Sequence, residues 1–152
     1  LRTANDVLTG KDNSEIEFHE VRGTEGLKEA TYNIAGLDIK VCVASGAANA
    51  KIVMDKIAKG EADWTFVEIM GCPGGCVNGG GQPVQPASVR NFVDLKGIRG
   101  KALYVADENL PVRKSHESEA IKRIYAEFLG EPNSHKAHEV LHTTYVKRPK
   151  YK

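Results

Sequence analysis

Residues 71–81 form a loop made largely of glycine and cysteine. No other feature of the sequence limits so strongly which fold the chain can adopt and which group it can bind. The eleven residues of the loop hold six of the fifteen glycines and two of the three cysteines in the 152-residue sequence. Because glycine lacks a side chain, such a loop can wrap closely around an inorganic group and direct backbone amides toward it. The thiolates of Cys72 and Cys76 are soft ligands that suit iron or zinc. The loop is therefore the predicted chemical site.

The segments before the loop predict a strand–helix–strand unit. A strand over residues 39–44, a helix with one apolar face over residues 50–57 and an apolar strand over residues 64–69 follow one another in the sequence. A crossover of this kind places its two strands parallel in one sheet. The loop then leaves the carboxyl end of a buried strand, which is the edge where open α/β sheets bind ligands. Glu68 interrupts that strand, either as a proton-handling acid or as a structural residue that pairs with a neighbouring cation or points to the amides of the loop.

The rest of the chain completes an α/β prediction. Residues 15–21 alternate as a strand, and residues 30–34 form a hairpin with residues 39–44. We therefore expect a partly parallel sheet of about four strands flanked by helices. Helical segments are predicted over residues 1–8, 94–106, 118–128 and 134–142, the last three capped by Asp94, Ser118 and Ser134. Residues 1–110 are predicted to form one lobe and residues 111–152 a C-terminal helical extension.

Composition excludes several classes of protein. The net charge of +1 argues against a nucleic-acid-binding protein. No run approaches the ~18 apolar residues of a membrane span, and no leader pattern opens the sequence. An odd number of cysteines, two of them in one loop, favours metal chemistry and a cytoplasmic location, with the periplasm as the alternative. Cys42 lies in an alternating strand and is predicted to be a core thiol. Because Leu1 stands where an initiator Met would, we expect a piece of a longer polypeptide or a processed chain.

Residues 66–83, FVEIMGCPGGCVNGGGQP, resemble the third cluster-binding signature of the iron-only (FeFe) hydrogenases. Further segments that recur in that family lie along the whole chain, at residues 1–4, 20–23, 26–30, 113–117 and 141–145. The last two belong to its small-subunit-like region. Residues 1–110 thus resemble the C-terminal part of the catalytic H-cluster domain, and residues 111–152 resemble the small-subunit-like tail.

The resemblance implies a cofactor, the H-cluster, in which four cysteines hold a 4Fe-4S cubane and one of them bridges to a two-iron unit carrying carbon monoxide, cyanide and a dithiolate. By position, Cys72 resembles a cubane ligand, Cys76 the bridging cysteine and Met70 a residue that lines the two-iron pocket. Gly74 and Gly75 would present bare backbone to the cofactor. The implied activity is the reversible reduction of protons to dihydrogen. The two earlier signatures of the family have no counterpart, so the chain alone is expected to be inactive.

The implied partners are the remainder of the catalytic domain, which would bring the other cluster cysteines, and an electron carrier such as ferredoxin. An alternative is a non-catalytic relative of the same fold that serves in iron–sulfur assembly or hydrogen sensing. A more remote alternative is a zinc hydrolase, because His138 and His142 enclose a glutamate in the pattern of zinc proteases. Histidines that only pack at a helix end are the simpler interpretation of that motif.

Overall fold

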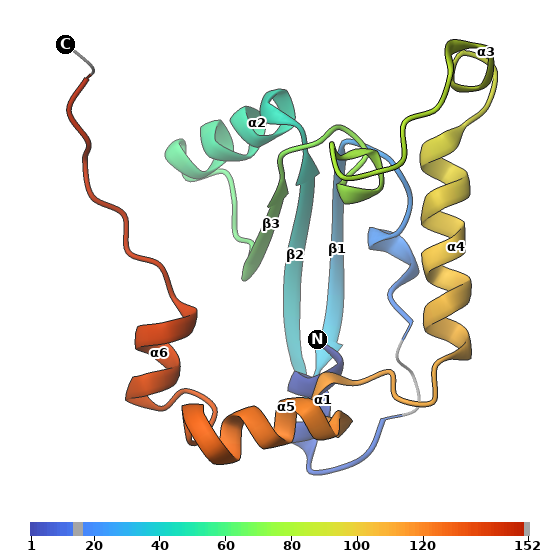
Figure 1. The fold of residues 1–152 in the computed structure, drawn as a ribbon. Coiled ribbons are helices and arrows are strands. Elements are labelled where there is room, and N and C mark those ends of the chain that lie inside the picture. Colours follow the sequence, from blue (N-terminus) through green and yellow to red (C-terminus); the bar gives the residue numbers. More distant parts are fainter. Residues whose placement is uncertain (14–16, 151–152) are drawn as a thin grey trace. The chain divides into compact units, whose positions relative to one another are not determined.

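A three-stranded mixed sheet is the framework of the N-terminal part of the chain in the computed structural model, which describes residues 1–13 and 17–150. β1 (Leu27–Ile34) and β2 (Leu37–Ser45) pair antiparallel, and β2 pairs parallel with β3 (Phe66–Met70), in the order β1-β2-β3 (Figure 1). The predicted α/β class, hairpin and parallel crossover are therefore confirmed. The described residues form three strands, one fewer than the about four predicted.

The missing strand is the one predicted over residues 15–21. Residues 15 and 16 lie outside the described residues, and His19–Val21 forms a short 3-10 helix, η1. The ring of Phe18 meets the ring of Tyr32 on β1 edge-on, with 4.8 Å between centroids, and the Tyr32 hydroxyl donates a 2.8 Å hydrogen bond to Glu20. The apolar alternation of this segment thus reflects side chains that pack on β1 rather than a backbone ladder.

The contact between Tyr32 and Glu20 predicts a loss of stability at alkaline pH. Burial, followed by the hydrogen bond to Glu20, raises the pKa of Tyr32 from 10.0 to about 12. The stabilisation is complete below pH 10 and is lost as the pH rises toward 12, because the unfolded phenol ionises first. Across that window we expect Tyr32→Phe to lose less stability than the unmodified chain in urea unfolding, by about 1 kcal/mol or less because solvent screens this exposed contact. An equal loss in both proteins would contradict the raised pKa.

One face of the sheet is covered by α2 (Ala47–Ala58). Val53 of this helix, 1% exposed, packs with the fully buried Cys42 and Ala44 of β2. Partly buried residues surround this cluster, namely Leu27, Trp64 and Val67. Cys42 is therefore the core thiol that was predicted, and burial raises the pKa of that thiol.

The outer strand β3 is more exposed than its apolar sequence predicts. Phe66 is 57% exposed and Ile69 is 48% exposed, so the prediction of a strand buried on both sides is wrong for this chain. The reason is the position of β3 at an edge of the sheet, where no further strand pairs with it among the described residues. A backbone edge of this kind remains available for pairing.

Helix α4 (Leu95–Asn109) confirms the helix predicted from residue 94. It begins at Asp94, whose carboxylate accepts a 3.1 Å hydrogen bond from the backbone N–H of Gly97. The short helix α3 (Ala87–Arg90) precedes it. At the start of the chain, α1 (Arg2–Thr9) ends at Gly10 in the left-handed conformation, as the sequence predicts.

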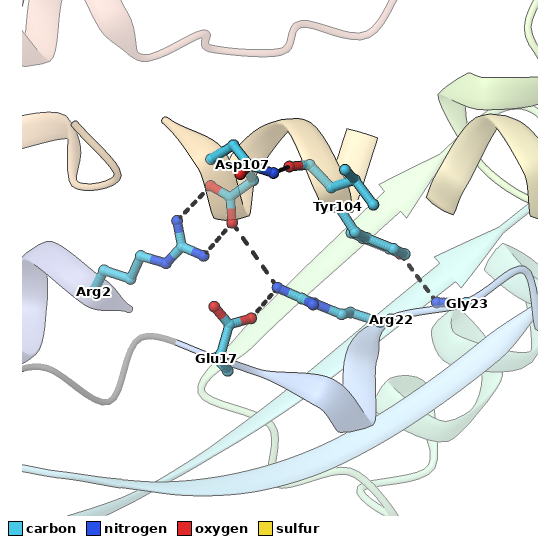
Figure 2. A network of polar contacts seen from close by, with 8 residues as sticks. Arg2, Glu17, Arg22, Gly23, Tyr104 and Asp107 are labelled. Carbon is cyan, nitrogen blue, oxygen red and sulfur yellow. Dashed lines mark hydrogen bonds and ion pairs between the residues drawn. The ribbon is translucent and has the colours of Figure 1, made fainter. Parts of the chain in front are cut away.

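A network of charged side chains ties α1, residues 17–22 and α4 together (Figure 2). Arg2 donates two hydrogen bonds, of 3.0 and 2.9 Å, to the carboxylate of Asp107 on α4. Arg22 forms ion pairs with Glu17 and, at 3.9 Å, with Asp107, and its guanidinium lies 4.7 Å from the centroid of the Tyr104 ring. The Tyr104 hydroxyl in turn accepts a 3.1 Å hydrogen bond from the backbone N–H of Gly23. Bidentate arginine–carboxylate pairs fix orientation, so the network sets the position of α4 relative to α1 and residues 17–23.

The chain divides into two compact units, Leu1–Leu110 and Pro111–Lys152, and the second is helical. Its elements are η3 (Ser115–Glu117), α5 (Glu119–Ile124), the π-helical turn η4 (Tyr125–Leu129) and α6 (His135–Leu141). Ser134 caps α6 as predicted: its hydroxyl accepts a 3.1 Å hydrogen bond from Ala137 and donates a 2.6 Å hydrogen bond to the carbonyl of Leu129. Leu129 and Ala137 are the buried apolar residues of this unit among those described.

Among residues 1–13 and 17–150, no helix has the length and apolar character needed to cross a membrane.

Candidate metal centre

The cysteine loop is held by the carboxyl ends of the two parallel strands. The backbone N–H of Gly46, just after β2, donates a 2.8 Å hydrogen bond to the carbonyl of Met70, the last residue of β3. The hydroxyl of Ser45, a residue only 3% exposed, accepts a 3.1 Å hydrogen bond from the N–H of Gly74 inside the loop. The loop thus starts at the sheet edge that the crossover predicts, and a buried hydroxyl fixes its first turn.

Successive tight turns shape the loop. Gly75 donates its N–H to the carbonyl of Cys72 at 2.9 Å, Asn78 to Gly75 at 3.0 Å and Gly79 to Cys76 at 3.0 Å. Within the second half of the loop, Cys76–Asn78 forms the 3-10 helix η2. The two cysteines therefore lie on one wrapped segment, rather than on one face of an α-helix as their four-residue spacing alone would allow.

Helix α4 supports the loop from its other side through Arg99. One guanidinium nitrogen of Arg99 donates a 3.1 Å hydrogen bond to the carbonyl of Val77, and the other donates a 2.8 Å hydrogen bond to the carbonyl of Pro83. These two acceptors bracket the glycines at the end of the loop. The loop is thereby fixed both to the sheet and to α4.

Glycines bring the sulfur atoms close to bare backbone. A side-chain carbon at Gly79 would lie 3.5 Å from Sγ of Cys72, and one at Gly75 would lie 3.0 Å from Sδ of Met70. Gly75 is buried and has φ 86° and ψ −169°, a conformation that essentially only glycine adopts. Cys72 is half-buried and Cys76 is exposed, and both are free thiols. Both cysteines are therefore available as ligands.

Four of the five predicted site residues line one cavity of about 290 Å³: Met70, Gly74, Gly75 and Cys76. The cavity lies on the face of the sheet opposite α2, because Val43, which also lines it, alternates with the core residues Cys42 and Ala44. Cys72 is not among the lining residues and lies beside Gly79 instead. The volume suits a small group rather than a large organic cofactor.

Glu68 also lines this cavity, from an exposed position on β3. No ion pair joins it to a cation among the residues that the structure describes. The ion-paired form of the structural alternative therefore has no support here. A carboxylate facing the cavity remains able to exchange protons with a bound group.

Sequence reasoning missed four residues that shape the site, namely Lys28, Ser45, Arg99 and Tyr104. For Ser45 a signal was available, because it ends β2 and parallel strands bring their carboxyl ends to one edge. Lys28 occupies a position in β1 where the alternation predicts an inward side chain, and a charged residue at such a position is informative. The contacts of Arg99 and Tyr104 are long-range and leave no local pattern.

The donor set fits a soft, iron-containing group. The Cys76 thiol and the Met70 thioether line the partly enclosed cavity beside glycine backbone, and the Cys72 thiol lies outside its lining, next to Gly79. Sulfur donors beside bare backbone are the surroundings that iron–sulfur groups occupy. Two cysteines are half of the four that a cubane needs. Cys42 does not add to them, because its sulfur is buried in the core against α2. A cubane at this loop would therefore need two further ligands.

The two histidines of the protease-like motif lie side by side at the end of α6, without a third ligand beside them in the described residues. Nδ1 of His138 and Nδ1 of His142 are 3.0 Å apart, and both side chains are exposed. No third histidine, cysteine or acidic ligand atom joins this pair in the described part of the chain. A catalytic zinc ion requires three protein ligands. The simpler interpretation, packing at the end of α6, accounts for the pair.

Comparison with known proteins identifies two family models that together match most of the chain. The model described as iron only hydrogenase large subunit, C-terminal domain, matches residues 1–80, which include both loop cysteines. The model described as iron hydrogenase small subunit matches residues 94–148. The second match begins within α4, ahead of the point where the structure divides into two units.

Individual relatives agree with these matches. Iron hydrogenase 1 of Clostridium pasteurianum is 42% identical over 148 residues, which are 97% of this chain and 26% of that protein. A probable cytosolic Fe-S cluster assembly factor of Drosophila willistoni is 29% identical over 93% of this chain and 29% of its own length. Among solved structures, an FeFe-hydrogenase of Chlamydomonas reinhardtii superimposes with a TM-score of 0.71 at 35% identity, covering 96% of this chain and 43% of that one. The chain thus spans about a quarter of the length of the curated relatives it matches.

Proposed function

The chain belongs to the iron-only hydrogenase family, and on that premise we propose that it is the C-terminal part of a catalytic domain that reversibly reduces protons to dihydrogen. The observation that carries the proposal is the position of Cys76 and Met70 on one cavity, within a glycine-rich loop fixed to the sheet edge. In a hydrogenase of this family, such a loop supplies ligands and one wall of the active site.

In this proposal Cys72 would hold the cubane, and Cys76 would hold both the cubane and a two-iron unit with carbon monoxide, cyanide and dithiolate ligands. When bound, that H-cluster supplies the electron transfer and the open iron at which dihydrogen forms or splits. The chain forms the surroundings of the bound group. Gly74 and Gly75 let the backbone approach the group, and Met70 places a polarisable sulfur at the cavity wall. Ser45 and Arg99 keep the two cysteines in a fixed loop.

The first partner that we propose is the remainder of the catalytic domain, which brings the other cubane cysteines. The short span of the chain relative to its relatives supports this partner, as does the exposed apolar edge strand β3 with Phe66 and Ile69. A further strand on that edge would pair the free backbone groups and cover both side chains. The second partner is an electron carrier such as ferredoxin, and the location that we propose is the cytoplasm.

Iron–sulfur assembly is the second candidate function, and a specific observation favours it. Relatives named as probable cytosolic Fe-S cluster assembly factors match more than nine-tenths of the chain, including the cysteine loop. A protein of that class would use Cys72 and Cys76 for an iron–sulfur cluster without the two-iron unit. The two functions therefore differ in what is attached to Cys76.

Infrared spectroscopy of the full-length protein, purified without oxygen, separates the two functions. For a hydrogenase we expect carbon monoxide and cyanide bands together with hydrogen evolution from a reduced electron donor. An iron count that matches clusters alone, with neither band and no hydrogen, would overturn the hydrogenase proposal in favour of assembly.

Met70 provides a test of the cavity wall. Met70→Leu keeps the volume and removes the sulfur, so we expect the free energy of unfolding to fall by less than about 1.5 kcal/mol. We expect the cubane signal in electron paramagnetic resonance to persist while hydrogen evolution decreases several-fold. Met54→Leu, on the exposed side of α2, is the matched control and should change neither. Loss of the cubane in Met70→Leu would show that Met70 supports the loop by packing alone.

A further inference from the structure

His138 and His142 form a pair of exposed imidazoles at the end of α6 that the proposed function does not use. Their Nδ1 atoms are 3.0 Å apart, and their rings meet edge-on with 4.6 Å between centroids. Packing at the end of the helix explains why the rings meet, but it leaves two nitrogen atoms side by side in exposed side chains. Imidazole nitrogen is the commonest protein ligand of zinc, copper and nickel.

The distance between the two nitrogens suits a single metal ion. Two imidazole nitrogens that bind one zinc ion at about 2.0–2.1 Å lie roughly 2.8–3.4 Å apart, from a right angle to a tetrahedral angle at the metal. The observed separation falls in this range. Without a metal ion it is the separation of a hydrogen bond, in which one ring donates to the other. A cation can therefore replace the shared proton while the nitrogens stay in place.

The ends of α6 hold the two rings in this position. The Ser134 hydroxyl links the start of the helix to the carbonyl of Leu129 and the N–H of Ala137, and both of those residues are buried. At the other end, the backbone N–H of His142 donates a 3.1 Å hydrogen bond to the carbonyl of His138. A spacing of four residues places both side chains on one face of a helical turn. An ordered turn thus presents both ligand atoms before a cation binds.

The number of ligands determines the kind of site. No third histidine, cysteine or acidic ligand atom joins the pair in the part of the chain that the structure describes. Two protein ligands leave the other coordination positions to water, in contrast to a catalytic zinc ion with three protein ligands. Imidazole ligands favour copper, nickel and zinc over manganese, whereas magnesium and calcium take oxygen ligands. The geometry therefore fits a structural site for a transition-metal cation.

We propose that His138 and His142 form a bidentate site for a divalent transition-metal cation such as zinc, which fastens the last turn of α6. The helix ends at Leu141, so a cation bound to both histidines spans that end. Residues 143–150, which have no regular secondary structure, leave the helix directly after this point. The inference is independent of the proposed function, because the site shares no residue with the cysteine loop.

Zinc titration of the full-length protein tests the site, with His138→Gln and His142→Gln as variants. Both side chains are exposed and glutamine is a good helix former, so we expect both variants to fold. Because two linked ligands bind far more tightly than one, isothermal titration calorimetry should show the affinity for one zinc ion per chain to fall about tenfold or more in each variant. Zinc that binds elsewhere, for example to free thiols, contributes equally to all proteins compared.

Hydrogen exchange provides a local measurement. Zinc should slow the exchange of the backbone amide of residue 142 in the unmodified protein and in neither variant, because the amide closes the turn that the cation would fasten. An unchanged zinc affinity in His138→Gln and His142→Gln overturns the proposal.

His135→Gln is the matched control, because His135 is an exposed histidine at the start of the same helix. It should leave the zinc affinity unchanged, and a loss equal to that of His138→Gln overturns the two-ligand assignment. Displacement of the zinc by equimolar magnesium also overturns the proposal, because it indicates oxygen ligands in place of imidazole. Iron content and hydrogen evolution should not differ among these variants, so they test the proposed function separately.

Discussion

Serine in place of Cys76 is expected to abolish hydrogen evolution by the full-length protein and to remove the carbon monoxide and cyanide bands from its infrared spectrum. The substitution exchanges a soft thiolate for a weakly acidic hydroxyl in the residue that we propose joins the two parts of the cofactor. The loss should exceed the roughly 10- to 100-fold effects seen when outer partners of metal ligands are changed. Hydrogen evolution and infrared absorption on the same preparation measure it.

Cys42→Ala is the matched control for Cys76→Ser. Cys42 is buried against α2 on the opposite face of the sheet, so its loss costs packing and leaves the cavity unchanged. We expect a lower free energy of unfolding with the infrared bands retained. Normal hydrogen evolution in Cys76→Ser would contradict the bridging role.

Alanine at Gly75 is expected to have the second-largest effect, although it adds a single methyl group. The residue has φ 86° and ψ −169°, and the new carbon would lie 3.0 Å from Sδ of Met70. Backbone strain of about 1–3 kcal/mol applies in that conformation, and the close contact adds to it. In the 152-residue chain we expect the unfolding midpoint to fall by about 4–8 °C. In the full-length protein, iron per chain should fall several-fold.

Gly80→Ala tests whether the loss expected for Gly75→Ala is specific to residue 75 or follows from any alanine in the loop. Gly80 lies in the same loop, its φ is not positive, and a side-chain carbon there would meet no atom within 4 Å. We expect an unfolding midpoint and an iron content close to those of the unmodified protein. Equal damage in Gly75→Ala and Gly80→Ala would mean that the loop tolerates no substitution, and the specific contact with Met70 would lose its support.

The parts of the fold that depend on local interactions could be predicted from the sequence. Asp94 and Ser134 cap their helices through hydrogen bonds to residues three positions ahead, which a sequence pattern records directly. The crossover from β2 through α2 to β3 follows from its periodicity and from the handedness of such units. These elements place the cysteine loop at the sheet edge without reference to any other part of the chain.

The errors arose where the environment of a segment differs from what its sequence implies. Phe18 and Val21 alternate with polar residues as in a strand. In the structure Phe18 packs on Tyr32 of β1, and the 3-10 helix η1 forms where the strand was predicted. Phe66 and Ile69 have the composition of a central strand, whereas β3 lies at the edge of the sheet in this chain. That contrast supports the proposed partner, because the remainder of the catalytic domain could cover this edge.

The support of the site could not be predicted because it depends on long-range contacts. Ser45 reaches Gly74 across 29 positions, and Arg99 reaches Val77 across 22. The burial of Lys28 depends on how α4 and Gly23 enclose the sheet face, which no local pattern records. The residues that bear the chemistry were identifiable from their types and spacing, whereas the residues that position them required the tertiary structure.

Diffraction from crystals of the full-length protein, measured at the iron absorption edge, tests the central claim most directly. We expect an anomalous peak within bonding distance of Sγ of both Cys72 and Cys76, with further iron in the cavity next to Cys76, Met70 and Lys28. A map in which the two sulfur atoms point to separate regions, with iron bound to neither, would contradict the assignment of this loop as a metal centre.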